Sequence, residues 1–436
     1  MLTADRGRAV NLQNMKPLNI LRLKIIDLVG GLQIYDVFGM LKKHQYLPKE
    51  ELDKIREEKL AALFAVARQS TIHYAAFSSF KDLPVLTKKI INKTPANFFS
   101  SWYRGKIIKK STSGSTGSPF AYHSSTEAQS HLWAGLLLSW ENTGYSFGEK
   151  VAFIAGSALI KSTKKHQVFY KLLNLEQYPA GIWTDETIQQ YLESMRHKKV
   201  KLICGYAMSI NVIADYILRE GVPPLKDLRG IVCTAEMLTD KIRANIEKAF
   251  GVKVFNQYGC NEAGIAAFEC DHHSLHLISS RSVYEIDAEG RLIGTDLTNS
   301  AYIFMKFNTG DLVEFSEKAC TCGRQYPVIK KIVGRSDDLI TDMKNKKIHS
   351  SYFNFLFKKD KSIMQYQVVF DERSICMNLM VDQHFSEKNY EFYMNLIKSN
   401  FDFEVYEVKT NEKFYSGSNS KHAFIIDKRK DQLSAV

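Results

Sequence analysis

A run of small, hydroxyl-bearing and turn-forming residues is the first stretch of the chain whose composition suits chemistry. It reads Ser-Thr-Ser-Gly-Ser-Thr-Gly-Ser-Pro over residues 111–119 and follows a basic run at residues 106–110. Glycine lets the backbone approach a ligand closely, and successive N–H groups with Ser and Thr hydroxyls offer convergent donors to phosphate oxygens. A flexible Ser/Gly linker is the alternative, and composition alone favours it. The sequence around this run must decide between an anion-binding loop and a linker.

A second group of residues has the types and spacing of metal ligands. Its members are Cys270, His276, Cys320 and Cys322. The two later cysteines are too close together for an ordinary structural disulfide framework, and four sulfur and nitrogen ligands suit a closed tetrahedral Zn²⁺ site. His272 and His273 are competing ligands, and buried free cysteines beside a surface histidine are the alternative. We expect a structural zinc site formed by the first four side chains.

Length and composition are those of a globular protein with room for two or three domains. The chain has 436 residues, of which 45% are hydrophobic and 24% charged. This composition allows a large core and argues against disorder. The formal net charge of +12 suits an anionic ligand, a nucleic acid or an acidic membrane surface. Because Lys and Arg are scattered and form no nucleic-acid motif, we expect no nucleic-acid partner.

The apolar segments are too short or too interrupted to predict a membrane span. The longest uninterrupted run, residues 151–160, has ten residues. Residues 18–41 are more apolar, but charges interrupt them and no small-residue cleavage site follows, so a signal peptide is not predicted either. Their basic, Leu- and Ile-rich start leaves a weak peripheral membrane contact open, with a packing helix as the favoured alternative. Because the seven cysteines form no disulfide framework, we expect a reducing, cytoplasmic location.

The elements that must position these residues follow two patterns. Between about 120 and 260, short apolar runs such as 151–155 and 230–234 alternate with helical patterns, which is typical of a parallel sheet with crossover helices. From about 265 to 330 the runs become short and alternating, which predicts antiparallel strands of a small barrel or sheet, with residues 308–311 as a turn between two of them. Ligands sit at the carboxyl ends of strands in open α/β sheets, so we expect the loops at 234–236 and 256–262 to line a cleft.

The predicted fold class is α/β with two domains. A large N-terminal domain over residues 1–336 would contain the parallel sheets and a small antiparallel β subdomain at about 265–330. A charged, glycine-containing junction at 330–338 would connect it to a small mobile C-terminal α+β domain over residues 337–436.

Four motifs in order resemble those of the adenylate-forming enzymes, in particular the phenylacetate-CoA ligase branch with its relatives in capsule and other polysaccharide biosynthesis. They are Ser-Gly-Ser-Thr-Gly-Ser-Pro at 113–119, Tyr-Gly-Cys-Asn-Glu at 258–262, Thr-Gly-Asp at 309–311 and Gly-Arg-Ser-Asp-Asp at 334–338. The resemblance covers nearly the whole chain, and four motifs in order are far more specific than any one of them. It implies an ATP-dependent ligase that activates a carboxylic acid as an acyl-AMP, releases pyrophosphate and passes the acyl group to an acceptor.

The resemblance also implies how the nucleotide would be held. The β- and γ-phosphates would contact Ser113, Gly114, Ser115, Thr116 and Gly117, the ribose hydroxyls Asp311, and the adenine Glu236 and Tyr258. An ionised carboxylate such as that of Asp311 accepts hydrogen bonds only and can take two donors. Turn formation is the alternative role for this residue.

Three catalytic roles and the role of the hinge fall on four further positions in this resemblance. Glu262 would bind Mg²⁺, a hard cation that prefers carboxylate oxygen, and Arg335 would assist at the ribose or phosphate. Asp337 would be the hinge about which the small domain rotates, and Lys421 would reach the substrate carboxylate and the α-phosphate. Helix capping is the alternative for Glu262, and an ordinary surface position is the alternative for Lys421.

The acceptor and the acid stay open at this stage. CoA ligases of the branch usually carry a glycine-rich segment after the hinge, whereas residues 341–349 contain no glycine, which weakens the case for CoA. A carrier protein and a glycan amine or hydroxyl are the other acceptors, and polysaccharide or cell-envelope biosynthesis is the expected setting. An aryl-CoA ligase and a non-catalytic nucleotide-binding relative are the alternative functions, and a homodimer is open. Some members of the branch have a zinc site that would join the antiparallel region to the strand before the hinge.

Overall fold

A computed structural model gives the fold of the chain. It describes residues 15–111, 120–155, 163–180, 184–335, 339–344, 346–349, 353, 357, 360, 362–411, 414 and 424–429. The predicted phosphate loop at 113–117, the predicted hinge Asp337 and the predicted catalytic Lys421 lie outside the described residues.

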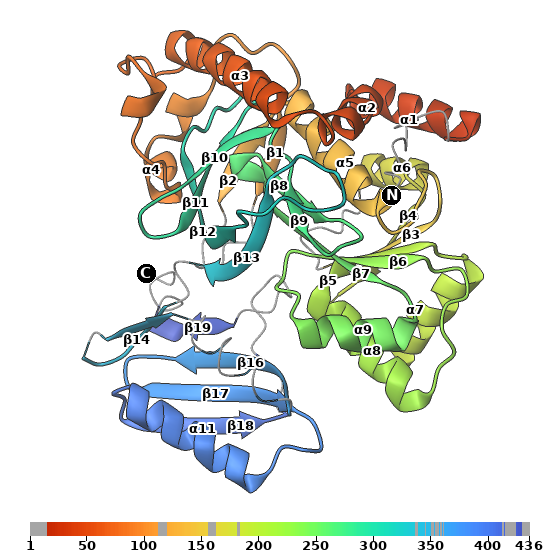
Figure 1. Ribbon diagram of the computed structural model, residues 1–436, viewed down its shortest axis with the longest axis vertical. Coiled ribbons are helices and arrows are strands. Elements are labelled where there is room, and N and C mark those ends of the chain that lie inside the picture. The colour runs from red at the N-terminus through yellow and green to blue at the C-terminus, as the bar shows by residue number, and fades with distance from the viewer. Residues whose placement is uncertain are drawn as a thin grey trace, which may run out of the picture.

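Helices and a small hairpin precede the main sheet (Figure 1). They are α1 (Pro17–Gly30), α2 (Ile34–His44), α3 (Lys49–Ser70), the 3-10 helix η2 (Phe80–Asp82), α4 (Lys88–Lys93), the 3-10 helix η3 (Pro95–Phe98), β1 (Ile108–Ser111) and β2 (Ala121–Ser124). Strands β1 and β2 pair antiparallel, and Ser111 lies opposite Ala121. The Ser/Gly run therefore connects the two strands of a hairpin.

An eleven-stranded sheet forms the centre of the structure. Its strands are β3 (Val151–Ala155), β4 (Leu175–Pro179), β5 (Leu202–Tyr206), β6 (Gly230–Thr234), β7 (Val254–Cys260), β8 (Ile265–Glu269), β9 (Leu275–Leu277), β10 (Ser282–Ile286), β11 (Arg291–Asp296), β12 (Phe307–Phe315) and β13 (Val328–Arg335). The helices of this region are α5 (Thr126–Glu141), α6 (Lys164–Leu172), α7 (Asp185–His197), α8 (Ala207–Glu220), α9 (Asp240–Phe250) and the 3-10 helix η4 (Asn261–Ala263).

The strand order joins a parallel half to an antiparallel half. The order is β10-β11-β12-β13-β9-β8-β7-β6-β5-β3-β4. Strands β3 to β7 pair in parallel, and antiparallel pairing begins between β7 and β8. The predicted α/β fold class is confirmed, and the antiparallel strands continue the parallel sheet instead of forming a separate one.

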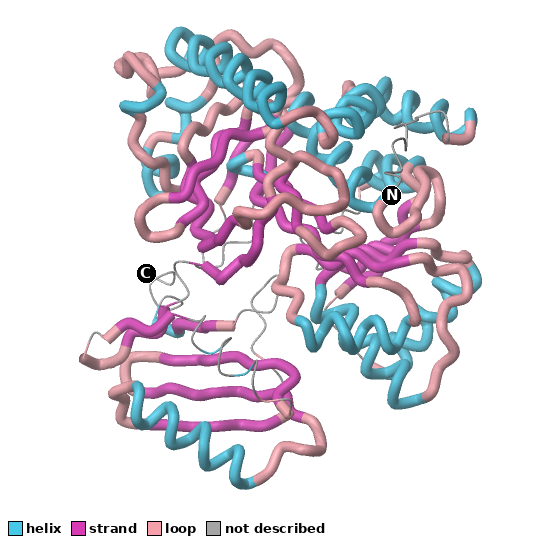
Figure 2. Tube along the Cα trace, in the orientation of Figure 1, coloured by secondary structure: helices cyan, strands magenta, loops and turns pink. Residues whose placement is uncertain are grey.

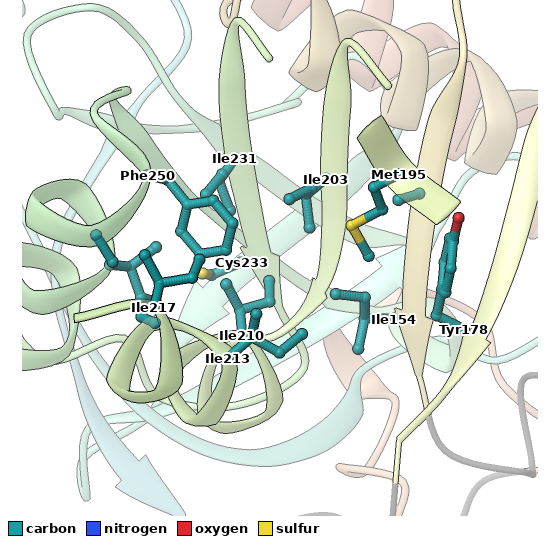
Figure 3. Packing of buried hydrophobic residues seen from close by; sticks show 14 of the residues in the cluster. Ile154, Tyr178, Met195, Ile203, Ile210, Ile213, Ile217, Ile231, Cys233 and Phe250 are labelled. Carbon is teal, nitrogen blue, oxygen red and sulfur yellow. The ribbon is translucent and has the colours of Figure 1, made fainter. Parts of the chain in front are cut away.

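Buried aliphatic side chains fix the helices to both faces of the parallel half. On one face, Ile203 and Ile231 of the sheet pack with Ile210 and Phe250 of the covering helices (Figure 3). On the other face, a second core joins α1, α2 and α5 to the strands and includes Trp140. Each fully buried side chain of this size contributes about 1.5–3 kcal/mol, so continuous apolar strands are stable only when both faces are covered.

A separate sheet and core form the C-terminal part (Figure 2). Its elements are β14 (Leu339–Thr341), β15 (Lys347–His349), β16 (Ile363–Phe370), β17 (Ser374–Val381), α11 (Glu387–Asn400), β18 (Val405–Thr410) and β19 (Ile425–Asp427). Four of the strands form a sheet in the order β18-β17-β16-β19, while β14 and β15 pair with each other. From the large part, Lys241 of α9 donates to the carbonyl oxygens of Phe357, Asp360 and Ile363.

Within the described part of the chain, no helix combines the length and the apolar character needed to cross a bilayer.

Two glycines that end helices offer a matched test of the packing around η4. Gly264 has φ +66°, and a Cβ there would lie 2.6 Å from the Cα of Asp296, whereas Gly251 has φ +67° and nothing within 4 Å of a Cβ. We expect Gly251→Ala to lower the free energy of unfolding by about 1 kcal/mol, and Gly264→Ala by about 2–4 kcal/mol, because only the second adds a backbone clash to the strained φ.

Chemical denaturation of both variants against wild type measures this difference. Equal losses would contradict the packing described for Gly264.

Candidate functional site

Asp311 lies in a bulge of β12, which corrects the prediction of a turn between two strands. The bulge places residues 309–311 opposite the single residue Leu292 of β11. Gly310 has φ +77° and its N–H donates to Asn308 Oδ1 over 2.8 Å, while Thr309 Oγ1 donates to the Leu292 carbonyl over 2.8 Å. The turn-forming residues are thus used inside a strand, where a bulge redirects a side chain.

The Asp311 carboxylate is held from the other half of the sheet. Tyr258 of β7 donates its hydroxyl to Asp311 Oδ2 over 2.6 Å, and the Asp311 backbone N–H donates to Thr309 Oγ1 over 3.1 Å. Burial raises the pKa of Tyr258 well above its usual range, and the Asp311 charge raises this pKa further, so the phenol remains a donor at neutral pH. Strands β7 and β12 are four places apart, which is about 19 Å in a flat sheet. The sheet must therefore curl until its two halves meet.

Glu262 lies on η4, immediately after β7. The residue is 8% exposed, and its two carboxylate oxygens lie 4.0 Å from Lys88 Nζ and 3.7 Å from Cys260 Sγ. Burial raises the pKa of the Cys260 thiol, and the charges of Glu262 and Asp311 raise this pKa further. The two carboxylates therefore lie near the same thiol. Carboxylate oxygen in such a position suits a hard cation such as Mg²⁺.

Lys88 is the residue of this region to which the sequence analysis gave no role. Its Nζ lies 5.6 Å from the ring centroid of Phe120, the first described residue after the Ser/Gly run, and 4.0 Å from Glu262. Thr87 caps the helix that begins at Lys88 by accepting the Ile90 N–H over 3.3 Å. The capping threonine is a sequence pattern that predicts a helix beginning at Lys88. Only the tertiary fold brings the lysine to Phe120, at the end of the Ser/Gly run.

The remaining described site residues flank this centre. Glu236 follows β6 and accepts the Met208 N–H over 2.9 Å, so its carboxylate caps the N-terminus of α8. Arg335 ends β13, where its backbone pairs with that of Asp311. The fold thus brings Tyr258, Glu262, Asp311 and the backbone of Arg335 together, with Glu236 at the end of an adjacent parallel strand.

The four predicted zinc ligands also come together. The ligand atoms of Cys270, His276, Cys320 and Cys322 all lie within 4.8 Å of one another. The Sγ atoms of Cys270 and Cys320 are 3.7 Å apart, and Cys322 Sγ is 3.3 Å from His276 Nε2. Tetrahedral geometry with Zn–S bonds of about 2.3 Å separates two sulfurs by roughly 3.8 Å. The ligand set and its spacing therefore fit Zn²⁺.

Neighbouring groups orient His276 and contact the two competing histidines. His276 is fully buried, and its Nδ1 lies 3.1 Å from the Tyr326 carbonyl, so donation from Nδ1 leaves Nε2 as the ligand atom. His272 contacts Thr321, and His273 contacts Arg243, in each case through Nδ1. The cluster connects the end of β8 and the short β9 to the β12–β13 connection, and the Val328 backbone of β13 pairs with that of His276.

Metal content tests the cluster directly. We expect about one Zn²⁺ per chain in purified wild type and a lower melting temperature after removal by a chelator, because metal binding contributes to folding. Cys320→Ser should lose the metal and melt at a lower temperature, while Cys376→Ser, outside the cluster on β17, should retain it. Elemental analysis of the two variants decides, and a zinc-free wild type or unchanged zinc in Cys320→Ser would exclude this site.

Comparison with known proteins agrees with the motifs. No family model matches the chain. Protein CapK of Staphylococcus aureus is 28% identical over 271 residues, which are 60% of this chain and 60% of CapK, so the match spans less than two thirds of that relative. A phenylacetate-coenzyme A ligase of Thermus thermophilus is 25% identical over 327 residues, which are 67% of this chain and 72% of that protein.

A solved structure shows the same fold. A 2-hydroxyisobutyryl-CoA ligase in the postadenylation state, in complex with R3-HIB-AMP, gives a TM-score of 0.69 at 16% identity and covers 90% of this chain and 94% of its own. The order of the motifs, the curated relatives and the shared fold agree on one assignment. They support a likeness to the adenylate-forming superfamily, and within it to the phenylacetate-CoA ligase branch.

Proposed function

We propose that the protein is an ATP-dependent ligase that activates a carboxylic acid as an acyl-AMP, releases pyrophosphate and then transfers the acyl group to an acceptor. The observation that carries this proposal is the Asp311 carboxylate, held on a strand bulge by the 2.6 Å hydrogen bond from Tyr258. A partly buried carboxylate with a fixed orientation is suited to accept the two hydroxyl donors of a ribose. The name of two curated relatives, phenylacetate-coenzyme A ligase, supports the same reaction class.

The reaction requires positive charge at the phosphates. An oxygen of the substrate carboxylate attacks the α-phosphorus of ATP, the bond from this phosphorus to the bridging oxygen breaks, and pyrophosphate leaves with that electron pair. In-line attack depends on positioning and on cations near the phosphate oxygens. Glu262 would hold Mg²⁺, which neutralises phosphate charge when bound. Lys88 supplies a second cation beside Glu262, and Lys421 would add a third from the C-terminal part.

The remaining nucleotide contacts extend from this centre. Residues Ser113, Gly114, Ser115, Thr116 and Gly117 would hold the β- and γ-phosphates within the connection between β1 and β2. Glu236 and Tyr258 would flank the adenine, and Arg335 would contact the ribose or a phosphate. Asp337 would be the hinge between the two parts of the chain. These roles follow the position of each residue in the family motifs.

The acceptor is the less constrained half of the proposal. Where CoA ligases of the branch usually carry glycine, β14 and β15 form a hairpin whose turn is ordered by Asp342, which accepts the Lys344 and Lys346 N–H groups over 3.0 and 2.8 Å. A turn filled by a side chain gives a thiol chain less access than glycine does, which favours a glycan amine or hydroxyl, or a carrier protein, over CoA. Polysaccharide or cell-envelope biosynthesis is the setting that the motif resemblance implies.

The aryl-CoA ligase is the second candidate function, because two of the curated relatives are named phenylacetate-coenzyme A ligase. A cytoplasmic location fits either candidate, since none of the seven cysteines forms a disulfide.

Removing one hydroxyl tests the nucleotide site. Tyr258→Phe keeps the ring but takes the donor from Asp311, so we expect Mg·ATP to bind about 5–10-fold more weakly, as the loss of one hydrogen bond of about 1 kcal/mol implies. Tyr178→Phe is the matched control, because it removes a tyrosine hydroxyl that contacts Ser194 away from the site. Calorimetric titration with ATP measures both variants, and equal affinities for the two would argue against a nucleotide at Asp311.

Pyrophosphate exchange tests the reaction itself. Wild type should exchange labelled pyrophosphate into ATP with at least one member of a panel of aryl, fatty, hydroxy and amino acids. Lys421→Ala should slow exchange by about a hundredfold or more, because a positioned cation at the α-phosphate is lost, while ATP binding persists. Lys398→Ala, on the exposed face of α11, is the control and should exchange normally.

Exchange that is unchanged in Lys421→Ala would contradict the role given to this lysine. ATP binding without exchange for any acid would instead favour the non-catalytic relative. Thioester formation when CoA is added in a second round would select the aryl-CoA ligase.

A further inference from the structure

Helix α1 exposes a continuous apolar face. The exposed members of this face are Leu18, Leu21, Ile25, Leu28 and Val29. At 100° per residue they fall within an arc of about 100°. Leu18 is 67% and Leu28 is 84% exposed, whereas Leu23 and Ile26 on the opposite side are buried in the core shared with α2 and α5. One side of α1 therefore already fixes the helix to the protein, and the other side is exposed. The helix lies at the edge of the structure (Figure 1).

The charges at the edge of this face are positive. On the helical projection Arg22 and Lys24 lie on opposite edges of the apolar arc, and Lys16 stands exposed at the N-terminal end. The one acidic residue of α1, Asp27, accepts the Ile34 and Tyr35 N–H groups over 2.7 and 2.9 Å. Its carboxylate thus faces the start of α2 and leaves the apolar face without a negative charge.

The neighbouring helix α6 also exposes lysines and an apolar side chain. α6 packs against α1 and carries the exposed Lys164 and Lys171 together with Val168, which is 55% exposed. The chain as a whole has a formal net charge of +12. An apolar row with basic edges is the composition of helices that lie in the interface of an anionic membrane.

A second copy of the chain fits this surface less well. A stable protein interface uses about 20–30 residues on each side, far more than one row of a 14-residue helix offers. Two copies would also bring surfaces of the same charge together. A bilayer needs only shallow insertion of an apolar face, and anionic headgroups complement the lysines.

We propose that α1, supported by α6, is a docking surface for an anionic phospholipid bilayer. Leu18, Leu21 and Leu28 enter the boundary between headgroups and acyl chains, while Lys24 at the edge of the apolar face contacts lipid phosphates. The helix lies in the plane of the membrane surface along its length of about 21 Å. Docking would hold the protein at a membrane independently of the ligase activity, so it neither requires nor follows from that activity.

Flotation of the full chain with vesicles tests the proposal. Wild type should float with vesicles that contain phosphatidylglycerol and remain unbound with phosphatidylcholine alone. The double variant Leu18→Ser/Leu28→Ser should bind at least about tenfold more weakly, because two leucines no longer leave water. The control Ile72→Ser/Phe392→Ser removes two equally large exposed side chains elsewhere, at 72% and 54% exposure, and should bind like wild type.

A charge variant separates the two contributions. Lys24→Glu should weaken binding, and added salt should reduce the difference between this variant and wild type, because the attraction is screened. All variants should keep the wild-type melting temperature and the same pyrophosphate exchange with a soluble acid, so a failure of docking is distinct from a failure of the proposed activity.

Three results would overturn the proposal. These are wild type that does not float with anionic vesicles, equal binding by the Leu18→Ser/Leu28→Ser variant, and equal binding of wild type to neutral vesicles. A concentration-dependent dimer that the same leucine substitutions abolish, without vesicle binding, would assign the surface to a second copy instead.

Discussion

The hydrogen bond from Tyr258 to Asp311 joins the two halves of one sheet, and the geometry of the site depends on it. The two residues belong to strands four places apart, so the bond forms only because the sheet curls. The curl is accommodated by the bulge at residues 309–311 and by the close approach of Gly264 to the Asp296 backbone. Glu262 lies on η4, which contacts both β11 and β12. The charges of its carboxylate and of the Asp311 carboxylate therefore both raise the pKa of the Cys260 thiol.

The cysteine and histidine cluster lies where the backbone pairing of the antiparallel half is short. Strand β9 has three residues, and only Val328 and Ile329 of β13 pair with it. Beyond this short pairing, the β12–β13 connection contacts the helices through Arg324, which donates to Gln45 Oε1 and to Asn142 Oδ1 over 2.8 Å each. A metal held by Cys270, His276, Cys320 and Cys322 would fix this connection to the ends of β8 and β9. The start of β13 would then be anchored, and its end is the position of Arg335 beside Asp311.

The parallel half was predictable because buried parallel strands have a simple pattern. The apolar runs at 151–155 and 230–234 coincide with β3 and β6, since strands covered on both faces are continuous apolar runs between glycine or charged residues. The meeting of Cys270, His276, Cys320 and Cys322 was also predictable, because cysteine and histidine at such spacing have few other uses, while the zinc itself stays a prediction. Residues 308–311 were misassigned because Asn, Gly and Asp favour a turn and a bulge alike, and only the partner strand β11 decides between them. The place of Lys88 beside Glu262 depends on contacts between distant segments and has no local pattern.

We propose that Asp311, Glu262 and the Ser/Gly connection form one nucleotide site. A crystal structure of the protein with Mg²⁺ and a non-hydrolysable ATP analogue would test this. We expect ribose hydroxyls within hydrogen-bonding distance of the Asp311 carboxylate, a cation on Glu262 and the terminal phosphates against residues 113–117. A nucleotide bound elsewhere, with Asp311 still contacted only by protein groups, would contradict it.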